Sequence, residues 1–248
     1  MVDTLGYRKK IAIVVPSVNT VVQPDYDSMR PEGVTNHLGR IIMPKLVLET
    51  DADFTKHVEG MRAGIFDAVD QVMRVEPDIL IMGLSLEAFW DGVVGAEDLL
   101  QRIEAHAGVP TTMGSAGILC ALDRYGGISR ISLITPHRPL GDERVRAYFT
   151  EAGYEAVHLK SFNCLTGVAI AQVSEDELRA AIDEVDGDDI DAIIQVGTNL
   201  PMAQVAAGAE SELGKPVIAI NTATYWHALR SNGIEDKIPG FGRLLETW

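Results

Sequence analysis

The chain has 248 residues, 46% of them hydrophobic and 23% charged, and a formal net charge of -15. This composition is typical of a globular protein with a large core, while the acidic excess disfavours binding to nucleic acid or to an anionic membrane surface. The first residues contain no apolar stretch of the signal-peptide type and no run reaches membrane-spanning length, so we expect a cytoplasmic protein.

Short β-rich runs alternate with longer amphipathic runs along the whole chain. Strands are predicted at residues 10–16, 37–43, 79–83, 130–135, 155–162, 192–197 and 217–221. Helices are predicted at residues 51–75, 95–107, 115–125, 142–152, 175–185, 202–213 and 222–231. Ser174 and Glu177 form a capping-box pattern at the start of one of these helices. Continuous apolar strands between helices indicate parallel sheets covered on both faces.

The same order of elements occurs twice, in residues 77–126 and 189–233. Each copy has a strand, a polar strand end, a helix, a Gly-x-Pro turn, a second strand and a second helix. We therefore predict an α/β fold of two pseudo-symmetric Rossmann-like lobes, each a parallel sheet flanked by helices, with the site in the cleft between them. Lobe one is predicted to comprise residues 1–114 and 222–248, with the C-terminal helix crossing over, and lobe two residues 115–221.

Small hydroxyl and amide residues follow the carboxyl ends of the predicted strands. Each of them could simply cap the helix that follows. Gathered around one cleft, they would instead form a set of neutral donors that suits a small carboxylate and stabilises an oxyanion. The predicted substrate-binding residues are Ser17, Asn19, Ser85, Gly197, Thr198, Asn199 and Asn221.

The motifs of nucleotide, metal and serine-hydrolase sites are missing from the sequence. There is no G-x-G-x-x-G segment with an acidic partner, no phosphate-binding P-loop and no G-x-S-x-G elbow. The six histidines are scattered without metal-ligand spacing. These absences disfavour a nucleotide site, a metal site and a serine-hydrolase site.

Four motifs occur in a fixed order along the chain. They are PSVNT at 16–20, MGLSLEAFWDG at 82–92, TPHRPLGDERVRAYF at 135–149 and PGFGRL at 239–244. Through them the sequence resembles the aspartate/glutamate racemase superfamily, and within it arylmalonate decarboxylases and maleate cis-trans isomerases. The resemblance implies a cofactor-independent lyase or isomerase that acts on a small carboxylate or dicarboxylate through an oxyanion-stabilised enolate. It leaves self-association open.

The resemblance also places two glycines where the superfamily carries catalytic thiols. The first position is Gly83, where the decarboxylases also have glycine, and the second is Gly197. If the family's chemistry was lost rather than replaced, Gly197→Cys is expected to restore it. Otherwise another side chain must transfer the proton that the thiol transfers in the family.

Three side chains are candidates for this proton transfer. His137 follows a predicted strand directly, and imidazole titrates near neutral pH. Glu87 lies in the apolar stretch LSLEAFW, where burial would raise its pKa. Cys164 lies in a predicted loop that could return a thiol to the site. Each also has a purely structural explanation. His137 could be a polar loop residue, Glu87 an acid in the first turn of a helix, and Cys164 an apolar loop residue.

Two other functions remain open at this point. A hydrolase of a small amide or cyclic substrate would use His137 or Glu87 as the base for water. A catalytically inactive homologue that binds a small acid would explain why both thiol positions are glycine. We expect an enzyme of the decarboxylase or isomerase type with a small-molecule carboxylate as its partner.

Overall fold

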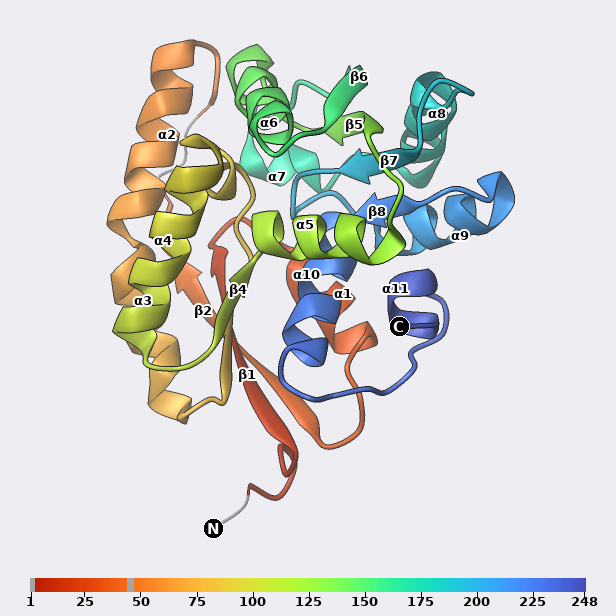
Figure 1. Cartoon of the computed structure of the whole chain (residues 1–248). Helices are drawn as coiled ribbons and strands as arrows, with labels where there is room; N and C mark the ends of the chain where they lie inside the picture. The colour runs from red at the N-terminus through yellow and green to blue at the C-terminus, as the bar shows by residue number, and fades with distance from the viewer. Residues whose placement is uncertain (1–2, 44–46) are drawn as a thin grey trace.

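Two parallel sheets of four strands each form the centre of the molecule (Figure 1). The computed structural model describes residues 3–43 and 47–248. The first sheet has the order β2-β1-β3-β4 and the second the order β6-β5-β7-β8. Their strands are β1 (Lys9–Pro16), β2 (Val34–Ile41), β3 (Ile79–Met82), β4 (Thr111–Met113), β5 (Arg130–Thr135), β6 (Glu155–Ser161), β7 (Ala192–Gln195) and β8 (Val217–Ala219).

Helices cover both sheets and fill the junction between them (Figure 1). In the first lobe α2, α3 and α4 lie along one side, and α6, α8 and α9 surround the second sheet. Between the lobes, α5 and α10 lie side by side. The α-helices are α1 (Val22–Ser28), α2 (Asp51–Ala63), α3 (Ile65–Val72), α4 (Gly92–Ala107), α5 (Gly114–Tyr125), α6 (Pro139–Glu151), α7 (Gly167–Ile170), α8 (Glu175–Val185), α9 (Ala203–Leu213), α10 (Ile220–Arg230) and α11 (Arg243–Glu246). Two short 3₁₀ helices are η1 (Met73–Val75) and η2 (Leu86–Ala88).

The predicted α/β fold with two parallel-sheet lobes is confirmed. The capping box at the start of α8 is present as well, because the Ser174 hydroxyl accepts from the N–H of Glu177 and the Glu177 carboxylate accepts from that of Ser174. The single helix predicted over residues 51–75 is wrong, because the chain turns at Gly64 between α2 and α3. Glycine is a poor helix former, and there a Cβ would lie 2.8 Å from Cγ2 of Ile41.

Several predicted strands also end one or more residues earlier than expected, among them those predicted at 37–43, 79–83, 155–162 and 192–197. The strand predicted over residues 217–221 ends at Ala219, and Asn221 lies in the first turn of α10. The prediction missed α1, a helix of only seven residues that contains a proline in its first turn. The assignment of residues 222–248 to lobe one stays a prediction, since α10 contacts β3 and β4 of the first sheet and β8 of the second.

The two lobes share one hydrophobic core. Residues 11–15 of β1 are completely buried, as are Leu133 of β5 and Ile194 of β7. All of them belong to a single apolar cluster, which continues through Ala223 and Tyr225 of α10. Burial of this size is the main stabilising contribution to a fold. The shared core therefore fixes the strand ends of one lobe relative to those of the other.

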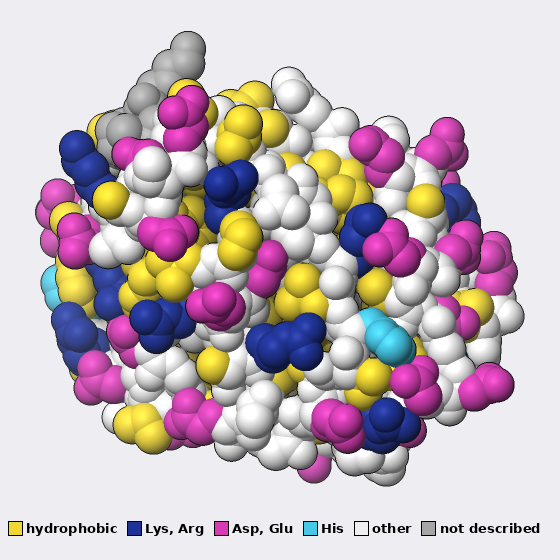
Figure 2. Space-filling model, turned by 90° about the horizontal axis from the view of Figure 1, so that it is seen from above, with side chains coloured by type: hydrophobic (Ala, Val, Ile, Leu, Met, Phe, Trp, Pro, Cys, Tyr) yellow, Lys and Arg dark blue, Asp and Glu magenta, His cyan; other side chains and the backbone are white. Residues whose placement is uncertain are grey.

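The surface agrees with the charge of the sequence. In the view of Figure 2, acidic side chains are spread over the face, with basic and apolar groups between them. Within the described part of the chain, no helix combines the length and the apolar character that crossing a bilayer requires.

Candidate active site

A pocket opens where the carboxyl ends of strands from both sheets meet. It has a volume of about 80 Å³. Its walls come from the segments after β1, β3, β5 and β7, from α2, and from the loop between β6 and α7. The lining residues are Pro16, Val18, Asn19, Leu48, Phe54, His57, Met61, Ser85, Leu86, Glu87, Pro136, His137, Cys164, Gly167, Ile170, Gly197, Thr198 and Asn199. Ligands of open α/β sheets bind at this end of the strands.

The structure brings eight of the ten predicted site residues into this lining. The other two lie outside it. Ser17 is exposed, and its hydroxyl accepts a hydrogen bond from the N–H of Met43 (3.0 Å). Asn221 is buried, and its amide donates to Oδ2 of Asp25 (2.8 Å) and to the carbonyl of Thr198 (3.0 Å). Both residues hold the framework around the pocket.

Asn199 ties the two lobes together. Its Oδ1 atom accepts from the backbone N–H groups of Thr20 (2.9 Å) and Val21 (3.3 Å) in the first lobe. Its Nδ2 atom donates to the carbonyl of Gly167 (2.7 Å). The amide is therefore occupied by the protein itself, and its first role is to join the lobes beside the pocket.

Asn199→Ala is accordingly expected to lower the free energy of unfolding by about 2 kcal/mol, because several buried backbone groups lose their partner. Urea denaturation measures this loss. The matched control is Asn232→Ala, whose amide donates to the carbonyl of Ala228 within one helix end (2.9 Å) and is expected to cost about 0.5 to 1 kcal/mol. Equal losses in the two variants would contradict the cross-lobe role of Asn199.

Thr198 and Asn19 form a second link between the lobes. The Thr198 hydroxyl donates to the carbonyl of Gly83 (3.2 Å) and accepts from Nδ2 of Asn19 (3.3 Å). The Oδ1 atom of Asn19 accepts from the N–H groups of Val21 (3.1 Å) and Val22 (2.9 Å) at the start of α1. For Asn19 the capping role is therefore present. Several of the hydroxyl and amide groups that were predicted to bind a substrate therefore form hydrogen bonds with other groups of the protein.

Ser85 and His137 face each other across the pocket from different lobes. The Oγ atom of Ser85 lies 3.4 Å from Nε2 of His137, which is long for a hydrogen bond. The His137 backbone is fixed, since its N–H donates to the Thr135 hydroxyl (3.2 Å) and its carbonyl accepts from the Ser161 hydroxyl (2.6 Å). The two side chains are held close to each other without a strong bond between them, so both can turn to a ligand.

His137 is a neutral imidazole in this pocket. Its side chain is buried, and burial together with nearby His57 lowers its pKa to about 3. A ring with so low a pKa is a weak base at neutral pH. The neutral ring can still donate a hydrogen bond from one nitrogen. The geometry therefore favours His137 as a hydrogen-bond donor over the proton carrier that the sequence suggested.

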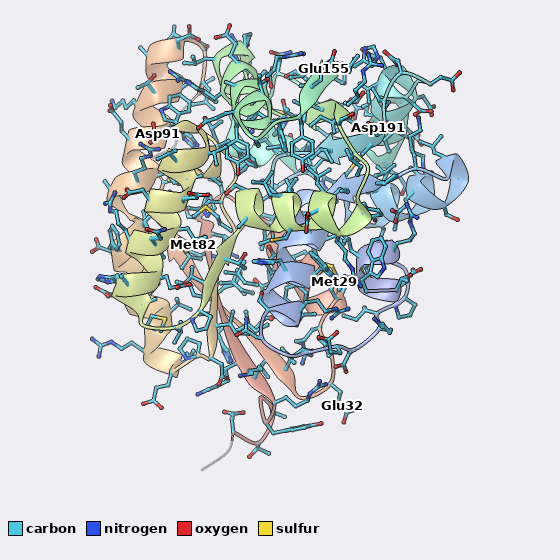
Figure 3. All side chains as sticks on the ribbon, viewed as in Figure 1. Met29, Glu32, Met82, Asp91, Glu155 and Asp191 are labelled. Atoms are coloured by element: carbon cyan, nitrogen blue, oxygen red, sulfur yellow. The ribbon has the colours of Figure 1, made fainter. Side chains whose placement is uncertain are left out.

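Glu87 lies in η2, in the segment between Met82 and Asp91 that Figure 3 labels at both ends. Only 2% of the residue is exposed, and neither carboxyl oxygen has a hydrogen-bond partner among the described residues. Burial raises the pKa of the carboxyl group to about 7, against smaller opposing effects of its own backbone N–H and of Arg62. Arg62 is itself paired with Asp91 at 2.6 Å. An unpartnered buried carboxyl is costly, which makes a functional role for it the natural explanation.

Cys164 is the only cysteine among the lining residues. Its backbone N–H donates to the carbonyl of Pro136 (2.9 Å), which holds the loop against the second lobe. Burial, with a smaller effect of Glu177, raises the pKa of the thiol. The thiol is therefore protonated at neutral pH and is a poor nucleophile.

His57 lines the pocket from α2, and the sequence reading missed it. Its Nδ1 atom is buried without a partner among the described residues, and burial lowers its pKa. A signal was present in the sequence: Phe54, His57, Val58 and Met61 recur at the spacing of one helix face. That spacing would have placed His57 on the buried side of α2.

Neither predicted thiol position has room for a side chain. Gly197 has φ +120°, and a Cβ on it would lie 2.5 Å from Cδ of Pro136. A Cβ on Gly83 would lie 2.7 Å from Cγ1 of Val15, and Gly83 is outside the lining. In the described residues no group of three or more His, Cys, Asp or Glu side chains could hold a metal ion.

Comparisons with known proteins place these features in a wider group. A model of the arylmalonate decarboxylase family matches residues 12–245. The arylmalonate decarboxylase of Bordetella bronchiseptica is 30% identical over 199 residues, which are 76% of this chain and 80% of that protein. The maleate isomerase of Nocardia farcinica is 27% identical over 255 residues, covering 97% of this chain and 96% of the relative.

The solved structures show the same fold. Maleate cis-trans isomerase of Nocardia farcinica bound to TRIS superposes with a TM-score of 0.86 at 21% identity, covering 96% of this chain and 98% of that one. A crystal structure of arylmalonate decarboxylase gives a TM-score of 0.69 at 22% identity, covering 95% and 98% of the two chains.

Proposed function

Because the chain belongs to the arylmalonate decarboxylase family, we propose that it is a cofactor-independent lyase or isomerase that forms an enolate on a small carboxylate in the pocket between the lobes. Its relatives are named as arylmalonate decarboxylase and maleate isomerases, which supports this class of enzyme. The same relatives do not favour a hydrolase or an inactive binding protein.

Ser85 and His137 supply the donors that such an intermediate needs. Negative charge develops on the substrate carboxylate oxygens when an electron pair moves from the α-carbon. A hydroxyl and a neutral imidazole N–H, held beside each other in a buried pocket, stabilise this charge without a cation. The pair contributes one donor from each lobe, so the enolate is held where the lobes meet.

Much of the lining beside this pair is apolar. Leu48, Phe54, Met61, Leu86 and Ile170 all belong to it. A carboxylate placed against this wall loses hydration, whereas the CO₂ that it becomes is neutral. This contrast favours decarboxylation over isomerisation. The compact pocket, with a volume of about 80 Å³, favours a small acid with apolar substituents.

The close approach of Ser85 to neutral His137 beside this apolar wall is the observation that carries the proposal. The test is incubation with phenylmalonate, 2-methyl-2-phenylmalonate and maleate, followed by chromatography of the products. We expect both malonates to lose CO₂ and Ser85→Ala to lower kcat about 100-fold, the effect of removing one oxyanion donor. Consumption of none of the three acids would contradict the proposed function.

A further inference from the structure

We propose that Glu87 is the catalytic acid that delivers a proton to the enolate carbon in this pocket. The inference rests on the proposed function, because it assigns a step of that reaction. It answers the question that Gly83 and Gly197 raise, since neither position offers a thiol and neither has room for one.

The position of Glu87 follows from one short turn of backbone. Ser85 and Glu87 both line the pocket, two residues apart. The turn is held because the N–H of Ala88 donates to the carbonyl of Ser85 and the N–H of Phe89 to that of Leu86, each at 3.0 Å. A substrate oxygen bound at Ser85 therefore brings the substrate next to the segment that carries Glu87.

The protein leaves the Glu87 carboxyl without a partner of its own. Both oxygens are buried and unbonded within the described part of the chain. By contrast, the side chain of Asn199 in the same lining bonds to backbone groups of both lobes. A buried carboxyl group without a hydrogen-bond partner lowers the stability of the folded protein. Its presence is explained if a bound ligand interacts with it.

The other titratable groups of the lining are less suited to giving a proton to carbon. His137 is neutral at working pH and its imidazolium form is not populated, because its pKa is about 3. The Cys164 thiol has its pKa raised and holds its proton tightly. A carboxyl with a pKa of about 7 is partly protonated at neutral pH and recovers its proton from water.

The step balances without a further reactant. The C–C bond to one carboxylate breaks, CO₂ leaves, and the electron pair stays on the α-carbon and the oxygens of the remaining carboxylate. The O–H bond of Glu87 then breaks as the new C–H bond forms at the α-carbon. The Glu87 carboxylate takes a proton from water once the product has left.

The charged and titratable groups facing η2 come from a few neighbours. The elements packed against η2 are α2 and α4. From α2 come His57 and Arg62, and Asp91 precedes α4, while His137 lines the same pocket. Arg62 and Asp91 form an ion pair, and both histidines have lowered pKa values. Asp25 and Asp142, whose pKa values burial raises to about 6, lie outside the lining, so the comparison with Glu87→Gln is what assigns a change in activity near pH 7 to Glu87.

The deciding experiment compares Glu87→Gln with Glu59→Gln, the same chemical change at an exposed position of α2. The probe is 2-methyl-2-phenylmalonate, followed from pH 5 to 9. We expect Glu87→Gln to lower kcat by 100-fold or more, as for loss of a general acid. KM should stay within about threefold, since ground-state binding is kept. Glu59→Gln should match the unsubstituted enzyme, whose kcat should fall as the pH rises through about 7.

Three results would contradict the proposal in different ways. Full kcat in Glu87→Gln would overturn the role of Glu87, and so would loss of kcat in Cys164→Ser with Glu87→Gln unaffected. A low kcat in Glu87→Gln with the fall above pH 7 still present would show a structural role instead. If the unsubstituted enzyme consumes neither the malonates nor maleate, the proposed function fails together with this inference.

Discussion

Gly197→Ala is expected to lower the free energy of unfolding by about 3 kcal/mol, the sum of backbone strain and overpacking. At φ +120° an L-residue is rarely accommodated, so the methyl group meets a backbone conformation that disfavours it. The same methyl carbon would lie 2.6 Å from Cγ of Pro136. Because Pro136 is part of the pocket wall, relief of this contact must move the wall.

Urea denaturation of the variant measures this loss, and Gly214→Ala is the matched control. Gly214 also has a positive φ, +68°, but a Cβ there meets nothing within 4 Å. The control is therefore expected to lose about 1 kcal/mol, the cost of the left-handed backbone alone. If Gly197→Ala were no less stable than Gly214→Ala, Pro136 would not block this position.

This result bears on Gly197 as the predicted position of the family's thiol. Gly197→Cys places the same Cβ against Pro136, so we expect a destabilised protein with no gain of activity. Decarboxylation or isomerisation gained by Gly197→Cys would contradict this expectation. Around Gly197, the backbone and Pro136 fit a residue without a side chain.

Glu87→Gln is expected to gain stability relative to the unsubstituted protein as the pH rises. The difference in free energy of unfolding between the two proteins should change by about 3 kcal/mol from acid to alkaline pH, because the pKa of the carboxyl group shifts on folding. The ordinary pKa of 4.5 rises to about 7 in the folded protein, because burial disfavours the charged form. The folded state therefore holds its proton more tightly than the unfolded state. The stability from this group is fully present below pH 4.5 and is lost as the pH rises through about 7.

The measurement is the difference in free energy of unfolding between the variant and the unsubstituted protein from pH 4 to 8. Burial also raises the pKa values of Asp25 and Asp142 to about 6, so both proteins change with pH and only the difference isolates Glu87. Glu59→Gln, at an exposed carboxyl, should show no such trend. If this difference in free energy of unfolding were constant from pH 4 to 8, folding would not raise the pKa of Glu87.

The fold could be predicted from the sequence because its main signals are local. Short apolar runs rich in β-branched residues, such as residues 11–15, favour buried strands, and Ser174 with Glu177 marks a helix start. One failure was not local: a side chain at Gly64, where α2 and α3 meet, would collide with Ile41, a residue distant in the sequence. The end of β8 was predicted at residue 221 instead of Ala219, because helix α10 begins at the next residue without a loop.

The site was predicted less completely, because bonding partners are not visible in a sequence. Asn199 and Asn19 were expected to hold a ligand, yet their amides bond to backbone groups. Ser17 was expected in the pocket and lies outside it. The sequence alone could not choose between Glu87 and His137, because only the structure shows that the carboxyl is unpartnered and the imidazole is kept neutral.

The central claim is that the pocket forms an enolate which takes its proton from a group that exchanges with water. Turnover of 2-methyl-2-phenylmalonate in D₂O, followed by ¹H NMR of the product, tests it most directly. The account predicts 2-phenylpropionate carrying one deuterium at the α-carbon in every product molecule. Turnover that leaves no deuterium at this carbon, or a product that retains both carboxyl groups, would contradict it.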